Sequence, residues 1–133
     1  MKSILVLIIF TFSNWNYQQS ETKLSAFEKV PDDISGCGNA YYLTQKDKKL
    51  SRLICWTDLT IAYIYINGKP TRLKNIKSRG KEMEFNISDY TLFINNSPLK
   101  QIDDEYYIMK ATITLKKGKQ VVWRKQVVGD GGC

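Results

Sequence analysis

The chain has 133 residues, of which 43% are hydrophobic and 25% are charged. This length suits one domain, and this composition excludes an intrinsically disordered protein. The net charge is +7 and histidine is absent, which excludes histidine-based catalysis and the common zinc sites.

The first 20 residues have the pattern of a secretory signal peptide. Lys2 precedes an apolar run over 4–12, and polar residues follow at once. The run is shorter than the roughly 20 residues that cross a bilayer. We therefore expect cleavage after 1–20 and a secreted or periplasmic protein with no membrane span. An uncleaved N-terminal anchor is the alternative. Cleavage removes only Lys2 among the charged residues and leaves a net charge of +6.

Residues 21–35 predict a polar lead-in with a turn at 31–33, and residues 36–133 predict a single β domain. Strand-forming residues recur there at short spacing. In chain order the expected strands are 40–44, 52–57, 59–66, 70–76, 81–87, 89–95, 106–115 and 120–128. Asn67-Gly68 predicts a tight hairpin turn, and 95–98 predicts a break. Seven or eight such strands predict an all-β fold, either a small antiparallel barrel or a sandwich.

Three cysteines allow one disulfide and one remaining thiol. Cys37 and Cys133 lie in glycine-rich, loop-like segments, whereas Cys55 lies in a strand-like run where it reads as a small buried hydrophobe. We therefore favour a Cys37–Cys133 disulfide, with Cys37–Cys55 and an intermolecular bond as alternatives. A bridge over about 100 residues stabilises by roughly 4 to 5 kcal/mol in the chain-entropy model. Joining the first strand to the last favours the barrel over the sandwich.

The sequence gives little support to catalysis. Acidic residues cluster only at 32–33 and 103–105, both in predicted turns where carboxylates are usually solvated. A nucleophilic serine or cysteine has no histidine to activate it. No phosphate-binding glycine motif or metal-ligand spacing is present. We expect a non-enzymatic protein with no catalytic residue, metal or cofactor.

Aromatic side chains give the better indication of function. The strand 59–66 is apolar on both faces, with Tyr63 and Tyr65 on one of them. Tyr63, Tyr65, Tyr41 and Tyr42 form the candidate binding surface, because tyrosine hydroxyls tolerate water. The alternative is burial of that face against a neighbouring loop or the N-terminal segment.

The net positive charge favours an anionic partner in the envelope or outside the cell. The lysines and arginines are scattered along the chain, a spacing typical of solvated strand faces. Export argues against a nucleic-acid partner.

The chain resembles a family of small, uncharacterised exported bacterial proteins. That family opens with Cys-Gly-Cys and aromatic residues, has a central Ile-Asn-Gly-Lys, and ends in Gly-x-Cys-Gly-Cys. The matching segments here are 37–42, 66–69 and 129–133, with Asn39 and Gly131 where the family has cysteines. The resemblance implies an exported domain whose ends are joined, without an assigned activity. A weaker similarity connects the chain to periplasmic inhibitors of c-type lysozyme, although their Ser-Gly-x-x-Tyr loop is absent and this chain is basic.

Together these features predict an exported β-barrel that acts as a binding module at the cell envelope. A structural or assembly protein that associates through the Tyr63/Tyr65 strand is the alternative, and a lysozyme-inhibitor-like protein is a further one.

Overall fold

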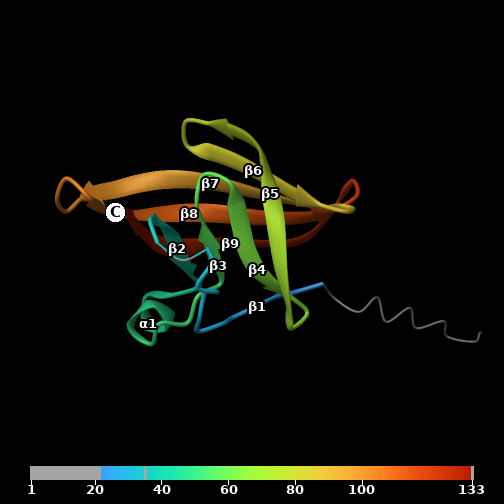
Figure 1. Cartoon of the computed structure of the whole chain (residues 1–133), viewed down its shortest axis with the longest axis horizontal. Coiled ribbons are helices and arrows are strands. Elements are labelled where there is room, and N and C mark those ends of the chain that lie inside the picture. The colour runs from blue at the N-terminus through green and yellow to red at the C-terminus, as the bar shows by residue number, and fades with distance from the viewer. Residues whose placement is uncertain (1–21, 35, 133) are drawn as a thin grey trace, which may run out of the picture.

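The computed structural model describes residues 22–34 and 36–132 (Figure 1). All strand pairings among them are antiparallel. The elements are β1 Leu24–Ser25, β2 Gly38–Tyr42, α1 Gln45–Lys49, β3 Cys55–Thr57, β4 Ile61–Ile66, β5 Lys69–Arg79, β6 Glu82–Ile87, β7 Tyr90–Gln101, β8 Tyr106–Lys117 and β9 Gln120–Gly132.

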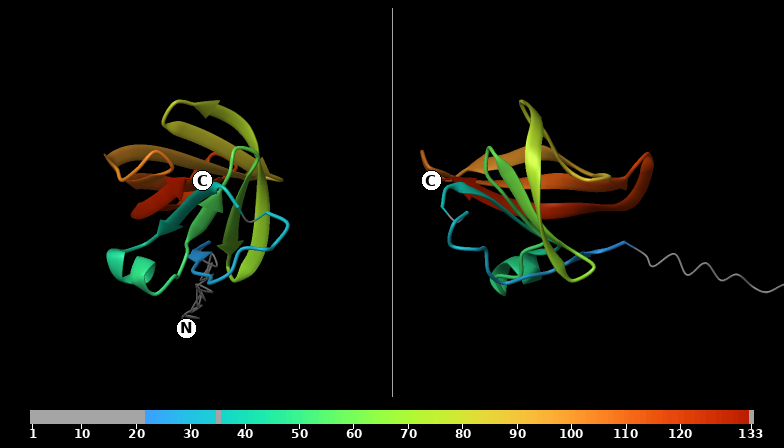
Figure 2. Two further views of the ribbon diagram at one scale, coloured as in Figure 1. Left: turned by 60° about the vertical axis from the view of Figure 1, so that its left-hand side comes forward. Right: turned by 45° about the vertical axis from the view of Figure 1, so that its right-hand side comes forward.

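Strands β2 to β9 close into an eight-stranded barrel. The strand order is β4-β3-β2-β9-β8-β7-β6-β5, and β5 pairs back onto β4. The two-residue β1 adds to β4 on the edge that β3 occupies further along. Figure 2 shows the strands wrapped around a common axis. The predicted all-β barrel is confirmed, because the β4–β5 pairing joins the two ends of the sheet.

The strands from β4 onward follow one another as hairpins. Asn67 and Gly68 have φ angles of 51° and 80°. Two consecutive residues with positive φ are what a type I′ turn requires, and this turn matches the twist of the strands it joins. The predicted hairpin at this position is therefore confirmed, with Ile66 paired to Lys69.

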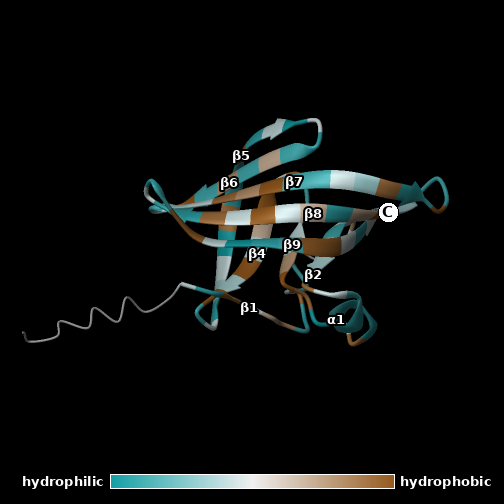
Figure 3. Cartoon of the chain, turned by 180° about the vertical axis from the view of Figure 1, so that it is seen from behind, coloured by the Kyte–Doolittle hydropathy of each residue, from teal (hydrophilic) through white to brown (hydrophobic). Residues whose placement is uncertain are grey.

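Side chains that point inward from these strands fill the barrel, and Figure 3 shows hydrophobic and hydrophilic residues following one another along β8. On β8 the residues Met109, Ala111, Ile113 and Leu115 are all buried, as their spacing in the sequence predicts. The inner residues of β4, Ala62, Ile64 and Ile66, join the same core. One face of each strand thus packs inward and the other stays outside.

Several strands run further than expected, and the largest differences are at the ends of β7 and β9. β7 passes through 95–98 and ends at Gln101, with a register shift between Pro98 and Lys100. A proline is tolerated there because β6 pairs with β7 only as far as Asn95, and bulges and strand edges accept proline. β9 continues beyond 128 to Gly132, since Gly38–Tyr42 of β2 gives residues 128–132 a partner.

A five-residue helix, α1, was not expected from the sequence. Thr44 caps it: its Oγ1 accepts a hydrogen bond from the Asp47 backbone N–H at 3.2 Å. Serine and threonine are favoured at this position because they satisfy a backbone donor that the first turn leaves unpaired. The helix bridges β2 and the chain that leads to β3.

The lead-in segment packs on the outside of the barrel. Phe27 exchanges backbone hydrogen bonds with Leu53, at 2.8 and 2.7 Å. The guanidinium of Arg72 donates two hydrogen bonds to the Asp33 carboxylate, at 2.6 and 2.8 Å. The lead-in therefore covers part of the barrel wall. The cluster that it forms there determines whether the predicted tyrosine surface is exposed.

Two predictions fall outside the described residues. The signal peptide, 1–20, is one, and the Cys37–Cys133 disulfide is the other, because Cys133 is not described. Within 22–34 and 36–132, no helix has the length and apolar character needed to cross a membrane.

Candidate functional site

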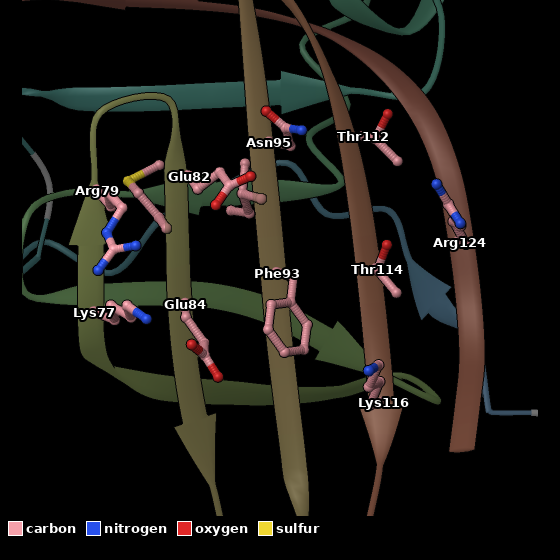
Figure 4. Close-up of a pocket in the computed structure, with 12 residues that line it drawn as sticks. Lys77, Arg79, Glu82, Glu84, Phe93, Asn95, Thr112, Thr114, Lys116 and Arg124 are labelled. Carbon is pink, nitrogen blue, oxygen red and sulfur yellow. The ribbon is translucent and has the colours of Figure 1, made fainter. Parts of the chain in front are cut away.

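An open groove of about 470 Å³ lies on the outer face of strands β5 to β9 (Figure 4). The register places Lys77, Glu84, Phe93, Thr114 and Arg124 next to one another in a single row across the five strands. Directly opposite residues in a sheet share a face. Lys77 and Arg124, at the two ends of this row, are exposed, so the row lies on the outside of the barrel. We call the site the outer groove.

A second row lies beside the first. It consists of Arg79, Glu82, Asn95 and Thr112, which are opposite one another in the three pairings that join β5 to β8. The two rows together supply most of the side chains that line one hollow. Figure 4 shows Arg79 and Lys77 along one side and Arg124 on the other.

Positive charge dominates the outer groove. Lys77, Arg79, Lys116 and Arg124 line it with only two carboxylates, Glu82 and Glu84. Within the described residues, the ion pairs join Lys48 to Asp130 and Arg72 to Asp33, and neither pair includes a groove residue. The groove cations are thus not neutralised by close ion pairs.

Phe93 gives the outer groove an aromatic surface at its centre. Its ring is half-buried, and the Lys116 ammonium lies 5.1 Å from the ring centroid. A cation over an aromatic face is attracted by the ring quadrupole, so this contact favours a position of Lys116 beside Phe93. Thr114 supplies a hydroxyl in the same row. The site therefore combines cations, hydroxyls and one apolar face, the features that bind an anion attached to a larger molecule.

The predicted tyrosine surface is not exposed on β4. Tyr63 retains only 5% of its accessible surface, and Tyr65 is half-buried. Phe27 of the lead-in contacts both rings, at centroid distances of 5.2 Å to Tyr63 and 5.1 Å to Tyr65. Burial, together with the neighbouring Tyr65 hydroxyl, raises the pKa of Tyr63 to about 12. The interpretation of Tyr63 as a contact residue is wrong, since the lead-in already covers it.

Tyr41 and Tyr42 lie on opposite faces of β2. Tyr41 is fully buried inside the barrel, and its hydroxyl donates a hydrogen bond to Asn96 Oδ1 at 2.7 Å. Burial raises the pKa of its phenol well above the usual range. Tyr42 is half-buried on the outside, where it packs against the cluster of Phe27, Leu53 and Trp56. Neither position supports the predicted exposed surface, and Tyr41 contradicts it.

Cys55 is a core residue with a free thiol. It is completely buried, and burial raises its pKa far above the usual value. A thiol that stays protonated is a poor nucleophile, so its position agrees with the reading of Cys55 as a small hydrophobe.

The acidic segment 103–105 has a structural role. Asp103 Oδ1 accepts hydrogen bonds from the backbone N–H groups of Glu105 and Tyr106, both at 2.8 Å. This arrangement closes the turn between β7 and β8. Among the described residues, no group of three or more cysteine or acidic side chains is placed to hold a metal ion.

Sequence reasoning did not identify the outer groove. Its cations are separated by up to 47 positions along the chain, from Lys77 to Arg124, and appear scattered. The signal that brings them together is the pairing register of five strands, which a single sequence does not specify before the turns and bulges are known.

Comparison with known proteins adds no relative. No family model, no curated protein and no solved structure matches the chain. The resemblances described above therefore remain expectations from short motifs.

Proposed function

We propose that this protein is an exported, non-enzymatic binding module, and that its outer groove binds an anionic ligand of the envelope or the extracellular medium. The main observation is the excess of four cations over two carboxylates in the groove around Phe93, where no close ion pair joins them among the described residues. Cations of one sign gathered in a hollow raise the local concentration of an oppositely charged ligand.

The form of the groove favours a polymer or a conjugate over a small free anion. Phe93 and the two threonines lie between Lys77 on β5 and Arg124 on β9. An anion with a sugar or another extended body can contact the cations at its charged groups and the Phe93 ring with its apolar face. A volume of about 470 Å³ falls within the range usual for ligand sites.

The export of the protein and its disulfide belong to the same proposal. Gly38 of β2 is paired with Gly132 of β9, and in the sequence Cys37 directly precedes Gly38 while Cys133 directly follows Gly132. This register supports a bridge between Cys37 and Cys133. Such a bridge persists in an oxidising compartment, as the N-terminal pattern of 1–20 predicts.

The assembly alternative has lost its main support. It required an exposed Tyr63/Tyr65 face on β4, and Phe27 covers that face. We therefore propose no assembly through this strand.

Binding of dextran sulfate tests the proposal, with neutral dextran as the uncharged control. We expect the exported protein to bind dextran sulfate and not dextran, with an affinity that falls as salt is raised. The double variant Lys116→Gln/Arg124→Gln should bind roughly tenfold more weakly, since two charge contacts at the surface are lost. Isothermal titration at several salt concentrations measures both effects.

A matched variant separates the groove from net charge. Lys46→Gln/Lys49→Gln removes the same charge from exposed positions of α1 and should bind dextran sulfate almost as the parent does. Equal weakening by the two double variants would mean that only overall charge matters, and the outer groove would then be rejected as the site.

A further inference from the structure

A second pocket, of about 440 Å³, lies at the end of the barrel where β2 starts and β9 finishes. Residues from the inner face of the barrel line it, among them Asn39, Thr57, Met83 and Tyr107. Leu59, in the loop between β3 and β4, is a lining residue that is 82% exposed. We call this site the barrel mouth. It shares only Met83 with the outer groove.

A hydrogen-bond network fixes the polar side chains behind the barrel mouth. The Tyr107 hydroxyl donates to Asn39 Oδ1, Asn39 Nδ2 donates to the Tyr41 hydroxyl at 3.4 Å, and Tyr41 donates to Asn96 at 2.7 Å. A Cβ at Gly131 would overlap both the Asn39 amide oxygen and the Tyr107 hydroxyl. Glycine at this position therefore leaves room for the network, which holds Asn39 and Tyr107 in one orientation.

Thr57 stands beside the network without completing it. Its side chain is 1% exposed, and its Oγ1 has no hydrogen-bond partner of acceptable geometry among the described residues. Burial raises the pKa of the nearby Tyr41 phenol, and the Thr57 hydroxyl partly opposes that shift without meeting the geometry of a hydrogen bond. A buried hydroxyl without a partner costs about 1 to 3 kcal/mol. A polar group kept at such a cost indicates a role that the protein alone does not fulfil.

The charge of the barrel mouth is low. Asp58 is the one charged side chain among the described residues that line it. Its Oδ1 accepts hydrogen bonds from the Thr60 and Ile61 backbone N–H groups at 2.6 and 2.8 Å, and from the Thr60 hydroxyl at 2.8 Å. Asp58 is thus engaged in its own turn. The remaining lining combines apolar surface from Leu59 and Met83 with neutral polar groups, which does not suit an anion.

We propose that the barrel mouth binds a small uncharged organic molecule, with an apolar body and a hydroxyl or carbonyl group that hydrogen-bonds to Thr57 Oγ1. The apolar body lies against Leu59 and Met83, and the polar group reaches the inner end of the pocket. Binding sites of this kind, mostly apolar with a few fixed polar groups, are common at the mouths of β-barrels. The site is distinct from the outer groove and does not depend on the function proposed for it.

Thr57→Val tests this proposal, because valine keeps the shape of threonine and removes the hydroxyl. We expect the variant to have a higher melting temperature than the parent, since an unsatisfied buried hydroxyl is gone. We also expect it to bind cyclohexanol at least fivefold more weakly. Thr57→Ser retains the hydroxyl and should retain most of the binding. NMR titration of the ¹⁵N-labelled protein with cyclohexanol reports the affinity and the amides that move, which should include Thr57, Leu59 and Tyr107.

Two results would overturn the proposal. One is equal affinity of Thr57→Val and the parent for cyclohexanol, or shifts that avoid the barrel mouth. The other is tighter binding of cyclohexylamine than of cyclohexanol, if this preference disappears in Asp58→Asn. That result would assign the barrel mouth to cationic ligands. Lys116→Gln/Arg124→Gln leaves the barrel mouth intact and should bind cyclohexanol as the parent does. A wrong proposal for the barrel mouth can therefore be distinguished from a wrong proposal for the outer groove.

Discussion

At the scale of single residues, Asp58 holds the turn between β3 and β4 through one carboxylate oxygen. Burial opposes its charge, but the hydrogen bonds from Ile61 and Thr60 outweigh burial and lower its pKa below the usual 3.8. A lowered pKa in the folded state means that the carboxylate stabilises the fold above pH 3.8, and that this contribution is lost as the pH falls through the folded-state pKa.

Asp58→Asn keeps an oxygen acceptor and removes the charge. We expect the variant to be less stable than the parent by about 1 kcal/mol at pH 7, because hydrogen bonds to a charged acceptor are the stronger ones. The difference should persist at pH 5 and shrink below pH 3.8 as the parent is protonated. Urea unfolding at these pH values measures it. An unchanged difference at pH 3 would show that the charge has no part in the turn.

At the scale of elements, the lead-in turns a sheet face that is apolar in sequence into a second buried cluster. Phe27 is 6% exposed and contacts Tyr63 and Tyr65, while Leu53 and Trp56 complete the cluster. Phe27→Ala should destabilise the protein by about 3 kcal/mol, as removal of buried aromatic rings usually does. Hydrogen exchange should show faster exchange of the Phe27 and Leu53 amides, which bond to each other's carbonyls. Lys29→Ala, at an exposed position of the same segment, is the control. Normal exchange at Leu53 in Phe27→Ala would mean that the lead-in holds without this ring.

At the scale of the whole molecule, the proposed Cys37–Cys133 bridge would join β2 to β9, two neighbouring strands of the closed barrel. We expect reduction by dithiothreitol to lower the stability of the parent by roughly 4 to 5 kcal/mol, the value for a loop of about 100 residues. Cys37→Ser should be destabilised to the same extent and should not respond further to reductant. Cys55→Ala, which alters only a buried thiol, should keep the response of the parent. A parent that is equally stable with and without reductant would contradict the bridge.

Local patterns were sufficient for much of the fold. The hairpin at Asn67-Gly68 and the inward faces of β4 and β8 follow from the chemistry of a turn and from an alternation of period two. The candidate sites did not follow in the same way. The sequence pattern around Tyr63 and Tyr65 is the same whether another segment covers them or not. Only the position of Phe27 shows that they are covered.

The sequence by itself determined the all-β class, the order of the strands along the chain and the inward face of most of them. The sequence determines these features because strand propensity, turn residues and side-chain alternation act over a few neighbouring residues. The tertiary structure decided how the strands close, and with it which distant residues meet. The register across five strands gathers Lys77, Phe93 and Arg124 into one row, and closure of the barrel brings Tyr41 of β2 to Asn96 of β7. Those contacts depend on all the strand pairings and bulges together, since a shift of one residue in the register of a strand would move each of its side chains to the other face.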